Sequence, residues 1–224
     1  MTDVDPEAHE RPRERLLRRG PSALSDAEVL SVLLRAGSPG RSAQERAAQL
    51  LQRCGGLAGL LGSDREALLR EPGLGPGTLS LLLAARELAR RGLEQRLRET
   101  AVMSSPGVTR AFLQQHLQHR DREVFCCLFL DAQHRLLHCE DLFLGTLDGA
   151  AVYPREVAVR AQRHRAAAVI LAHNHPSGVA RPSAADRQIT ERLQRALALL
   201  DVRVLDHIVV GCGACYSFAE AGLL

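Results

Sequence analysis

The sequence predicts a two-domain protein, in which an all-α N-terminal domain is followed by an α/β domain. Three observations support this division. Helix-start signals and glycine stops recur through the first hundred residues. Apolar runs of strand length begin only after residue 120, and 224 residues are enough for two small domains. We therefore assign residues 1–19 to an N-terminal segment, 20–92 to the helical domain, 93–104 to a linker and 105–224 to the α/β domain.

Serine and glutamate residues mark the predicted helix starts in the N-terminal half. Three pairs have the spacing at which the two residues cap a helix reciprocally: Ser25 with Glu28, Ser42 with Glu45, and Ser63 with Glu66. Gly37 and the pair Gly55-Gly56 follow helical patterns, as expected where glycine ends a helix. After Gly92, the segment "LEQRLRETAVMSS" is charged and then small and polar, which indicates a helix end and the linker.

Residues 64–91 contain two predicted helices joined by the turn "PGLGPG". This pattern is similar to a helix-hairpin-helix motif, whose backbone amides bind the DNA backbone without sequence preference. On this hypothesis a phosphate lies at the turn glycines and two arginines of the second helix add ionic contacts: Gly73, Gly75, Gly77, Arg86 and Arg90. The alternative is a hairpin that only packs two helices together.

Strands and helices alternate in the predicted α/β domain. "EVFCCLFL", residues 123–130, is typical of a strand buried on both faces, and "LLHCEDLFLG" forms the next strand after the turn "DAQHR". Pro154 suits the first turn of a helix, and "AAAVILA" predicts another buried strand. A helix from Ala184 to about Leu200 and a strand over "VRVLDHIVVG" follow. This order predicts a mixed sheet flanked by helices.

The end of the strand "AAAVILA" carries the strongest functional signal. His173 and His175 follow it one residue apart, so in a strand both side chains lie on one face, about 6 to 7 Å apart. Asp186, in the first turn of the next helix, is a candidate third ligand. Two histidines and a carboxylate leave one position of a tetrahedral zinc ion open, as in catalytic sites. The alternatives are histidines that only form hydrogen bonds and a simple capping box of Ser183 with Asp186.

The spacing His-x-His, seven residues, Ser-x-x-Asp resembles the motif of JAB/MPN-type zinc metallopeptidases. "REVFCCLFLDAQHRLL", "YPREV" and "AAAVILAHNHPSGVARPSAADRQIT" are similar to segments of the bacterial RadC proteins, named historically for DNA repair, and the resemblance covers nearly the whole chain. It implies a JAB/MPN, cytidine-deaminase-like fold for the α/β domain and Zn²⁺ bound by His173, His175 and Asp186. It also implies that Ser183 helps to hold the attacking water or the oxyanion.

The candidates for the general base upstream are the carboxylates of Glu123, Glu140, Asp141 and Glu156, and spacing alone does not choose among them. The resemblance points to Glu123, because these peptidases place that residue at the N-terminal end of an early strand. Glu123 would deprotonate the zinc-bound water, which attacks an amide carbonyl, and would then protonate the leaving amine. An exposed carboxylate beside Arg122 at a strand edge is the alternative. The implied activity is hydrolysis of a peptide or isopeptide bond, for which the sequence identifies no substrate.

Composition limits the other function classes. The net charge is +3, every one of the 29 basic residues is arginine, and only 3% of residues are aromatic, so a base-stacking platform for single strands is not expected. The N-terminus is charged and no apolar window approaches 18 residues, which predicts a cytoplasmic protein without a membrane partner. The rival hypothesis is a non-catalytic DNA-binding accessory factor in repair or recombination, with a structural or vestigial metal site.

The cysteines and one further histidine have simpler predicted roles. Six cysteines without a secretory signal indicate reduced thiols, and those in apolar strands are expected in the core: Cys126, Cys127 and Cys139. Cys212 and Cys215 have zinc-ribbon spacing but no second pair nearby, so a hairpin is expected there. His207 lies in an apolar strand and predicts a buried, hydrogen-bonded histidine, with a contact to a metal ligand as the alternative.

Overall fold

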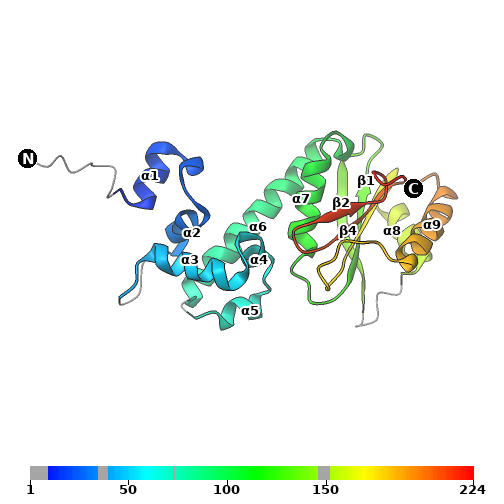
Figure 1. The fold of residues 1–224 in the computed structure, drawn as a ribbon. Coiled ribbons are helices and arrows are strands. Elements are labelled where there is room, and N and C mark those ends of the chain that lie inside the picture. Colours follow the sequence, from blue (N-terminus) through cyan, green and yellow to red (C-terminus); the bar gives the residue numbers. More distant parts are fainter. Residues whose placement is uncertain (1–9, 35–39, 73, 146–151) are drawn as a thin grey trace, which may run out of the picture. The chain divides into compact units, whose positions relative to one another are not determined.

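The structure, a computed structural model, describes residues 10–34, 40–72, 74–145 and 152–224 (Figure 1). The chain divides into two compact units, Met1–Ala85 and Arg86–Leu224. The first is helical and the second is a mixed sheet with helices, as the sequence predicts. Among the described residues, no helix is both long enough and apolar enough to cross a membrane.

The first unit is a small helical assembly. Its helices are α1 (Pro12–Arg19), η2 (Pro21–Ala23), α2 (Asp26–Leu34), α3 (Ala43–Cys54), α4 (Leu57–Gly62), α5 (Arg65–Arg70) and the start of α6 (Pro76–Glu99). Leucines from α2 to α6 form its core, among them Leu30, Leu50, Leu68 and Leu79. Helix α1 was not predicted. It begins with Pro12 and ends with two arginines, which suit the two ends of a helix dipole.

Two of the three predicted capping boxes are confirmed. Ser42 N donates to the Glu45 carboxylate at 2.7 Å and Glu45 N donates to Ser42 Oγ at 3.2 Å, and Ser25 and Glu28 are bonded in the same way. The predicted cap at Ser63 is wrong. Asp64 caps α5 by accepting from Ala67 N at 2.6 Å, while Ser63 Oγ donates to a carbonyl of the preceding helix. Aspartate caps as well as serine does, so sequence spacing alone does not choose between neighbours.

Glycine ends helix α3 as predicted, since Gly55 has the left-handed conformation with φ 74°. The predicted stop at Gly37 lies outside the described residues.

The segment predicted as a linker, residues 93–104, is structured instead. Helix α6 continues to Glu99 and is followed by the short helix η3 (Val102–Ser104), and the boundary between the compact units falls at residues 85 and 86. Leu93, Leu97 and Val102 contact the core of the second unit. Leu93 and Leu97 are four residues apart and therefore share one helix face, a short apolar stripe among charged neighbours that composition alone obscures.

The second unit contains a five-stranded sheet in the order β2-β1-β3-β4-β5. Its elements are α7 (Pro106–Leu117), β1 (Val124–Leu130), β2 (Leu136–Leu144), α8 (Pro154–Arg163), β3 (Ala168–Asn174), α9 (Ala184–Ala198), β4 (Arg203–Val210) and β5 (Cys215–Ser217). Strands β3 and β4 are parallel and the other pairs antiparallel. The predicted strands and helices of this region are present, and the hairpin expected at Cys212 and Cys215 joins β4 to β5. Helix α7 was not predicted.

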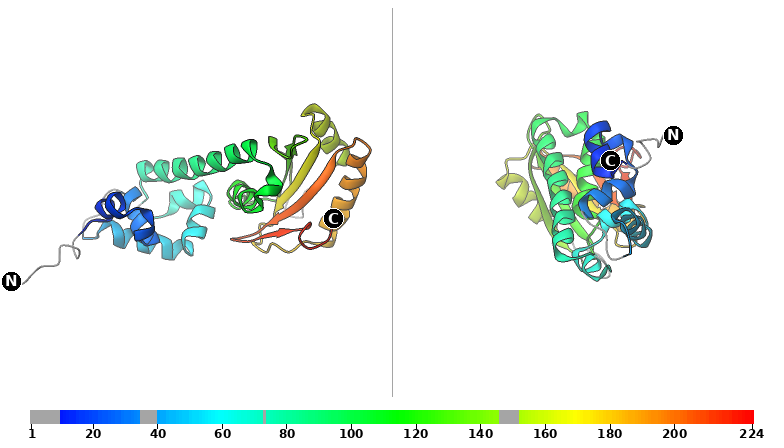
Figure 2. Two further views of the ribbon diagram at one scale, coloured as in Figure 1. Left: turned by 90° about the horizontal axis from the view of Figure 1, so that it is seen from above. Right: turned by 90° about the vertical axis from the view of Figure 1, so that its left-hand side faces the viewer.

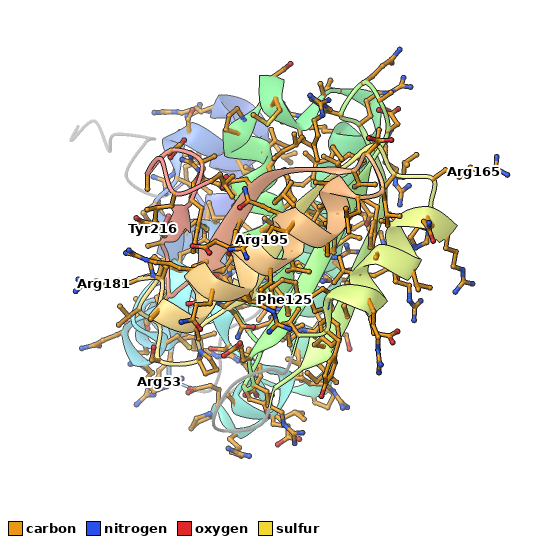
Figure 3. The ribbon with its side chains drawn as sticks, turned by 90° about the vertical axis from the view of Figure 1, so that its right-hand side faces the viewer. Arg53, Phe125, Arg165, Arg181, Arg195 and Tyr216 are labelled. Carbon is orange, nitrogen blue, oxygen red and sulfur yellow. The ribbon has the colours of Figure 1, made fainter. Side chains whose placement is uncertain are left out.

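The two faces of the sheet carry separate cores. On β1, Cys126 and Leu128 belong to the cluster that includes α7, whereas Phe125, Cys127 and Phe129 belong to the cluster that includes α8 and α9. Figure 2 shows the strands of this unit between α7 and α9. Figure 3 looks onto the α9 side, where Phe125 is labelled and Arg195 lies on the solvent side of α9. Alternation along a strand thus assigns neighbouring residues to opposite cores.

The observed cap of α5 can be tested against the sequence-based expectation. We expect Asp64→Ala to lower the free energy of unfolding by about 1 kcal/mol, because Ala67 N loses its acceptor. Ser63→Ala is the control and should change it by less than about 0.5 kcal/mol. Urea unfolding of the two variants and the wild type measures both values, and a larger loss in Ser63→Ala would contradict the structure.

Candidate metal centre

The three predicted metal ligands lie together at the end of β3. His173 Nε2 is 3.0 Å from His175 Nε2 and 3.3 Å from Asp186 Oδ1, and His175 Nε2 is 3.5 Å from Asp186 Oδ2. His175 N donates to Val210 O at 2.9 Å, so the pairing with β4 continues past the last residue of β3. This continuation keeps both histidines on one face of the sheet, and Asp186 reaches them from the first turn of α9.

A buried hydrogen-bond chain determines which nitrogen of His173 carries the proton. Thr190 Oγ donates to Asp186 O at 2.5 Å and lies 2.6 Å from His207 Nδ1, which must therefore be the donor to Thr190. His207 Nε2 is then an acceptor for His173 Nδ1 at 2.8 Å. Burial keeps the pKa of His207 well below its usual value, in agreement with a neutral ring. In the neutral ring, the lone pair of His173 is consequently on Nε2, the atom that faces His175 and Asp186.

His175 has the same tautomer for a simpler reason. Its Nδ1 lies 2.9 Å from Val179 O, and a carbonyl can only accept. The hydrogen is therefore on Nδ1 and the lone pair on Nε2. With both rings neutral, two imidazole lone pairs and a carboxylate oxygen thus converge, an arrangement that a cation or an added proton relieves. Two neutral imidazoles and one carboxylate are a ligand set that suits Zn²⁺.

Asp186 is both a capping residue and a member of the cluster. Ser183 N and Ser183 Oγ each donate to Asp186 Oδ2 at 2.7 Å, and Asp186 N donates to Ser183 Oγ at 3.1 Å. Burial alone raises the pKa of Asp186, but the two hydrogen bonds from Ser183 lower it by favouring the charged carboxylate. The carboxylate stays charged, and Ser183 directs it toward the two histidines.

Glu123 directly precedes β1, the strand that pairs with β3. The antiparallel register joins Phe125 to His173, which brings position 123 level with position 175 and on the same side of the pleat. Glu123 is half-buried, and its backbone oxygen accepts from Gly145 N at 2.7 Å. The structure therefore brings this end of β1 beside the end of β3 that carries the histidines.

Two residues that support the cluster were missed in the sequence. Asn174 lies between the histidines and faces the other side of the sheet, where its Oδ1 accepts from Val124 N at 2.8 Å and its Nδ2 donates to Arg122 O at 2.9 Å. It thereby anchors the backbone on both sides of Glu123. Asparagine is depleted in strands, which was a usable signal. The sequence signal for Thr190 was weak. It consisted only of the spacing of four residues after Asp186, which puts both residues on the same helix face.

The candidate DNA-binding residues have mixed surroundings. Gly73 lies outside the described residues, Gly75 O accepts from Leu79 N at 3.0 Å at the start of α6, and Gly77 is in its first turn. Arg90 forms ion pairs with Glu87 and Glu94, each at 2.9 Å, so these carboxylates offset its charge. Arg86 lies on α6. The burial of His119 and the nearby charge of Arg86 lower the pKa of His119 to about 4.

The helical unit also contains an arginine-lined cavity of about 250 Å³. Its walls are Leu34, Arg41, Arg46, Gln49, Leu50, Arg53, Pro72 and Leu74. Arg41 donates to Gln49 at 3.0 Å, and Arg53 is paired with Glu71 at 2.7 Å. This cavity was not predicted, because it forms only when α3 packs beside the turn before α6.

The fold and the cluster are those of a JAB-type domain, which follows the helical unit in the sequence. Residues 103–223 match the family described as a RadC-like JAB domain, and residues 4–80 match the one described as UPF0758 N-terminal. The chain is 54% identical to a UPF0758 protein of Nitrosospira multiformis over 98% of this chain and 97% of that protein. It is 54% identical to one of Nitrosococcus oceani over both full lengths, and 56% identical to one of Methylibium petroleiphilum over 96% of each. The chain therefore belongs to the UPF0758 family of RadC-like proteins, which confirms the resemblance predicted from the sequence.

The hydrogen-bond chain from His173 through His207 to Thr190 can be tested by its effect on metal binding. We expect Thr190→Val to weaken Zn²⁺ binding by about 10- to 100-fold, because His207 loses the partner that fixes the tautomer of His173. Thr190→Ser retains the hydroxyl and should bind like the wild type. Competition with a chromophoric chelator measures the affinities. Equal affinities in the valine and serine variants would rule out a role for this chain.

Proposed function

We propose that the C-terminal domain is a zinc-dependent hydrolase of the metallopeptidase or isopeptidase type, with a cytidine-deaminase-like arrangement of sheet and helices. The observation that carries this proposal is the meeting of two imidazole nitrogens, 3.0 Å apart, beside the carboxylate of Asp186. Bound there, Zn²⁺ polarises a carbonyl oxygen and makes water easier to deprotonate. His173, His175 and Asp186 would hold the ion with three protein ligands, which would leave a coordination position for substrate, unlike a closed structural site.

In this proposal Glu123 is the general base. It takes a proton from the attacking water and returns it to the leaving amine, which is what a half-buried carboxylate level with His175 is suited to do. Asn174 supports that role by holding the backbone on both sides of Glu123. Ser183 orients Asp186 through Oδ2, in addition to the contact with the oxyanion that the resemblance implies.

The hydrolase proposal separates metal binding from turnover. The wild type should contain about one Zn²⁺ at this cluster, lost in His173→Ala and in Asp186→Ala. Glu123→Gln should keep the metal and lose about 10²- to 10⁴-fold in rate, because the amide cannot accept a proton. Glu156→Gln, a change to another acidic residue of the same unit, is the matched control.

Turnover can be measured without knowing the substrate. A denatured bacterial peptide mixture is incubated with the protein in ¹⁸O-labelled water, and new carboxyl ends that carry the label are counted by mass spectrometry. Label that requires Glu123 and the metal ligands supports the proposal. Fully zinc-loaded wild type that incorporates no more label than Glu123→Gln contradicts it and favours the non-catalytic alternative.

A second candidate function, contact with a DNA backbone, is favoured by the cavity of the helical unit. Three arginines surround it next to the turn that leads into α6, and guanidinium groups bind phosphate in a forked geometry. In the sequence-based hypothesis this turn is part of a helix-hairpin-helix motif with Gly73, Gly75 and Gly77. A Cβ at Gly75 or Gly77 would meet nothing within 4 Å, so the backbone there has open space beside it.

Salt dependence tests the second candidate. We expect the double variant Arg41→Gln/Arg46→Gln to bind a random double-stranded oligonucleotide more weakly, with the slope of log affinity against log salt reduced by about 0.9 for each lost phosphate contact. Arg195→Gln removes an exposed arginine of the other unit and is the control. Fluorescence anisotropy at several salt concentrations gives both quantities. An unchanged slope in the double variant would show that the arginines of this cavity do not contact DNA phosphates.

A further inference from the structure

A second cluster of metal-ligand residues lies on the opposite side of the sheet. His116 is in the last turn of α7, Cys126 in β1 and Cys139 in β2, and one ligand atom from each lies within 4.8 Å of the others. Cys126 is fully buried in the core formed with α7, and Cys139 packs against the same core. None of these residues belongs to the cluster of His173, which borders the other face of β1.

We propose that His116, Cys126 and Cys139 form a second, structural metal site that binds a thiophilic d¹⁰ ion, Zn²⁺ in the cell, and joins the end of α7 to β1 and β2. Two thiolates and one imidazole are a ligand set that selects zinc over the hard ions Mg²⁺ and Ca²⁺. Three protein ligands would leave one tetrahedral position for water. The proposal does not depend on the hydrolase function.

An irregularity in the pairing of β1 with β2 brings the two cysteines to one face. Phe125 pairs with Phe143, but the next residue, Cys126, pairs with Asp141, so the register shifts by one residue at Leu142. Leu128 then pairs with Cys139. Because residues that face each other across a pair of strands share a side of the sheet, Cys139 and Asp141 lie on the Cys126 side. In a regular ladder they would lie on the other side.

The histidine of the cluster is held in place by charged neighbours. Asp141 Oδ1 is 2.6 Å from His116 Nε2, and Asp141 Oδ2 accepts from Arg120 at 2.8 Å. A carboxylate that bonds to the ring orients it and increases its basicity, the arrangement found around metal-bound histidines.

The arrangement of the two thiols also suits a cation. Cys126 and Cys139 are hydrogen-bonded to each other, so their sulfur atoms already lie side by side. A divalent ion with two thiolates and a neutral imidazole has no net charge, so its burial beside an apolar core avoids the large cost of an isolated charge. The distances also fit: Zn–S and Zn–N bonds of about 2.3 and 2.0 Å need a closure of roughly 1 Å.

Cobalt substitution distinguishes the two sites, because only a thiolate site gives an intense sulfur-to-cobalt charge-transfer band in the near ultraviolet. The full chain, without a histidine tag, is stripped of metal, loaded with Co²⁺ and separated from free ion by gel filtration. We expect the band in the wild type and in His173→Ala/Asp186→Ala, which leaves every cysteine unchanged. Elemental analysis of the zinc-loaded proteins should give two ions per chain in the wild type and one in that double variant.

Cysteine variants assign the band to its residues. Cys139→Ala and His116→Gln should each lose the band and one Zn²⁺ per chain, whereas Cys127→Ala, which removes an equally buried thiol on the other face of β1, should keep both. Absence of the band in His173→Ala/Asp186→Ala overturns the proposal, whether or not the cysteine variants fold. So does a band that persists in Cys139→Ala and disappears in Cys127→Ala. Loss of hydrolysis in Glu123→Gln with the band intact would concern only the first site.

Discussion

The two-residue periodicity of β3 is the constraint on which the first cluster depends. Strand pairing with β1 and β4 holds residues 173–175 extended, so His173 and His175 must share a face and Asn174 must take the other. The two faces of the strand over residues 173–175 therefore have different functions. One presents imidazole nitrogens, and the other binds the backbone around Glu123 through an amide. A shift of one residue in the register would exchange these roles and remove the cluster.

The buried chain from His173 through His207 and Thr190 to the backbone of Asp186 links the two elements that supply ligands. Its members come from β3, β4 and α9, so the tautomer of a strand histidine is determined by a helix hydroxyl. The same Asp186 contributes its carboxylate to the cluster and its carbonyl to the chain. Because Asp186 takes part in both, packing α9 onto the sheet positions the carboxylate and orients the His173 ring together.

The sequence was most informative where a feature is local. Alternation and spacing predicted the strand ends, His173, His175 and Asp186, and the capping pair at Ser42, because each depends on residues a few positions apart. It failed where three-dimensional packing decides. Asp64 in place of Ser63 depends on where the chain enters α5, and the helix through Leu97 depends on a core contact with distant residues. His207 was predicted as a buried, hydrogen-bonded histidine, but its place between His173 and Thr190 joins three elements that no spacing rule connects.

Strand β1 lies beside both clusters, and the alternation of its side chains between the two faces of the sheet keeps the clusters apart. Phe125 stacks near the His173 ring, with 6.2 Å between centroids, while its neighbour Cys126 is directed into the opposite core. The backbone between them is also where the register with β2 shifts, which gives Cys126 its partners on β2 without changing the antiparallel pairing with β3. Because a β-sheet separates its two faces by the thickness of its own backbone, side-chain changes in one cluster reach the other only by moving β1 itself. A metal ion on the α7 side would therefore act on the first cluster by restraining the strand from which Glu123 extends, and not by contact with its ligands.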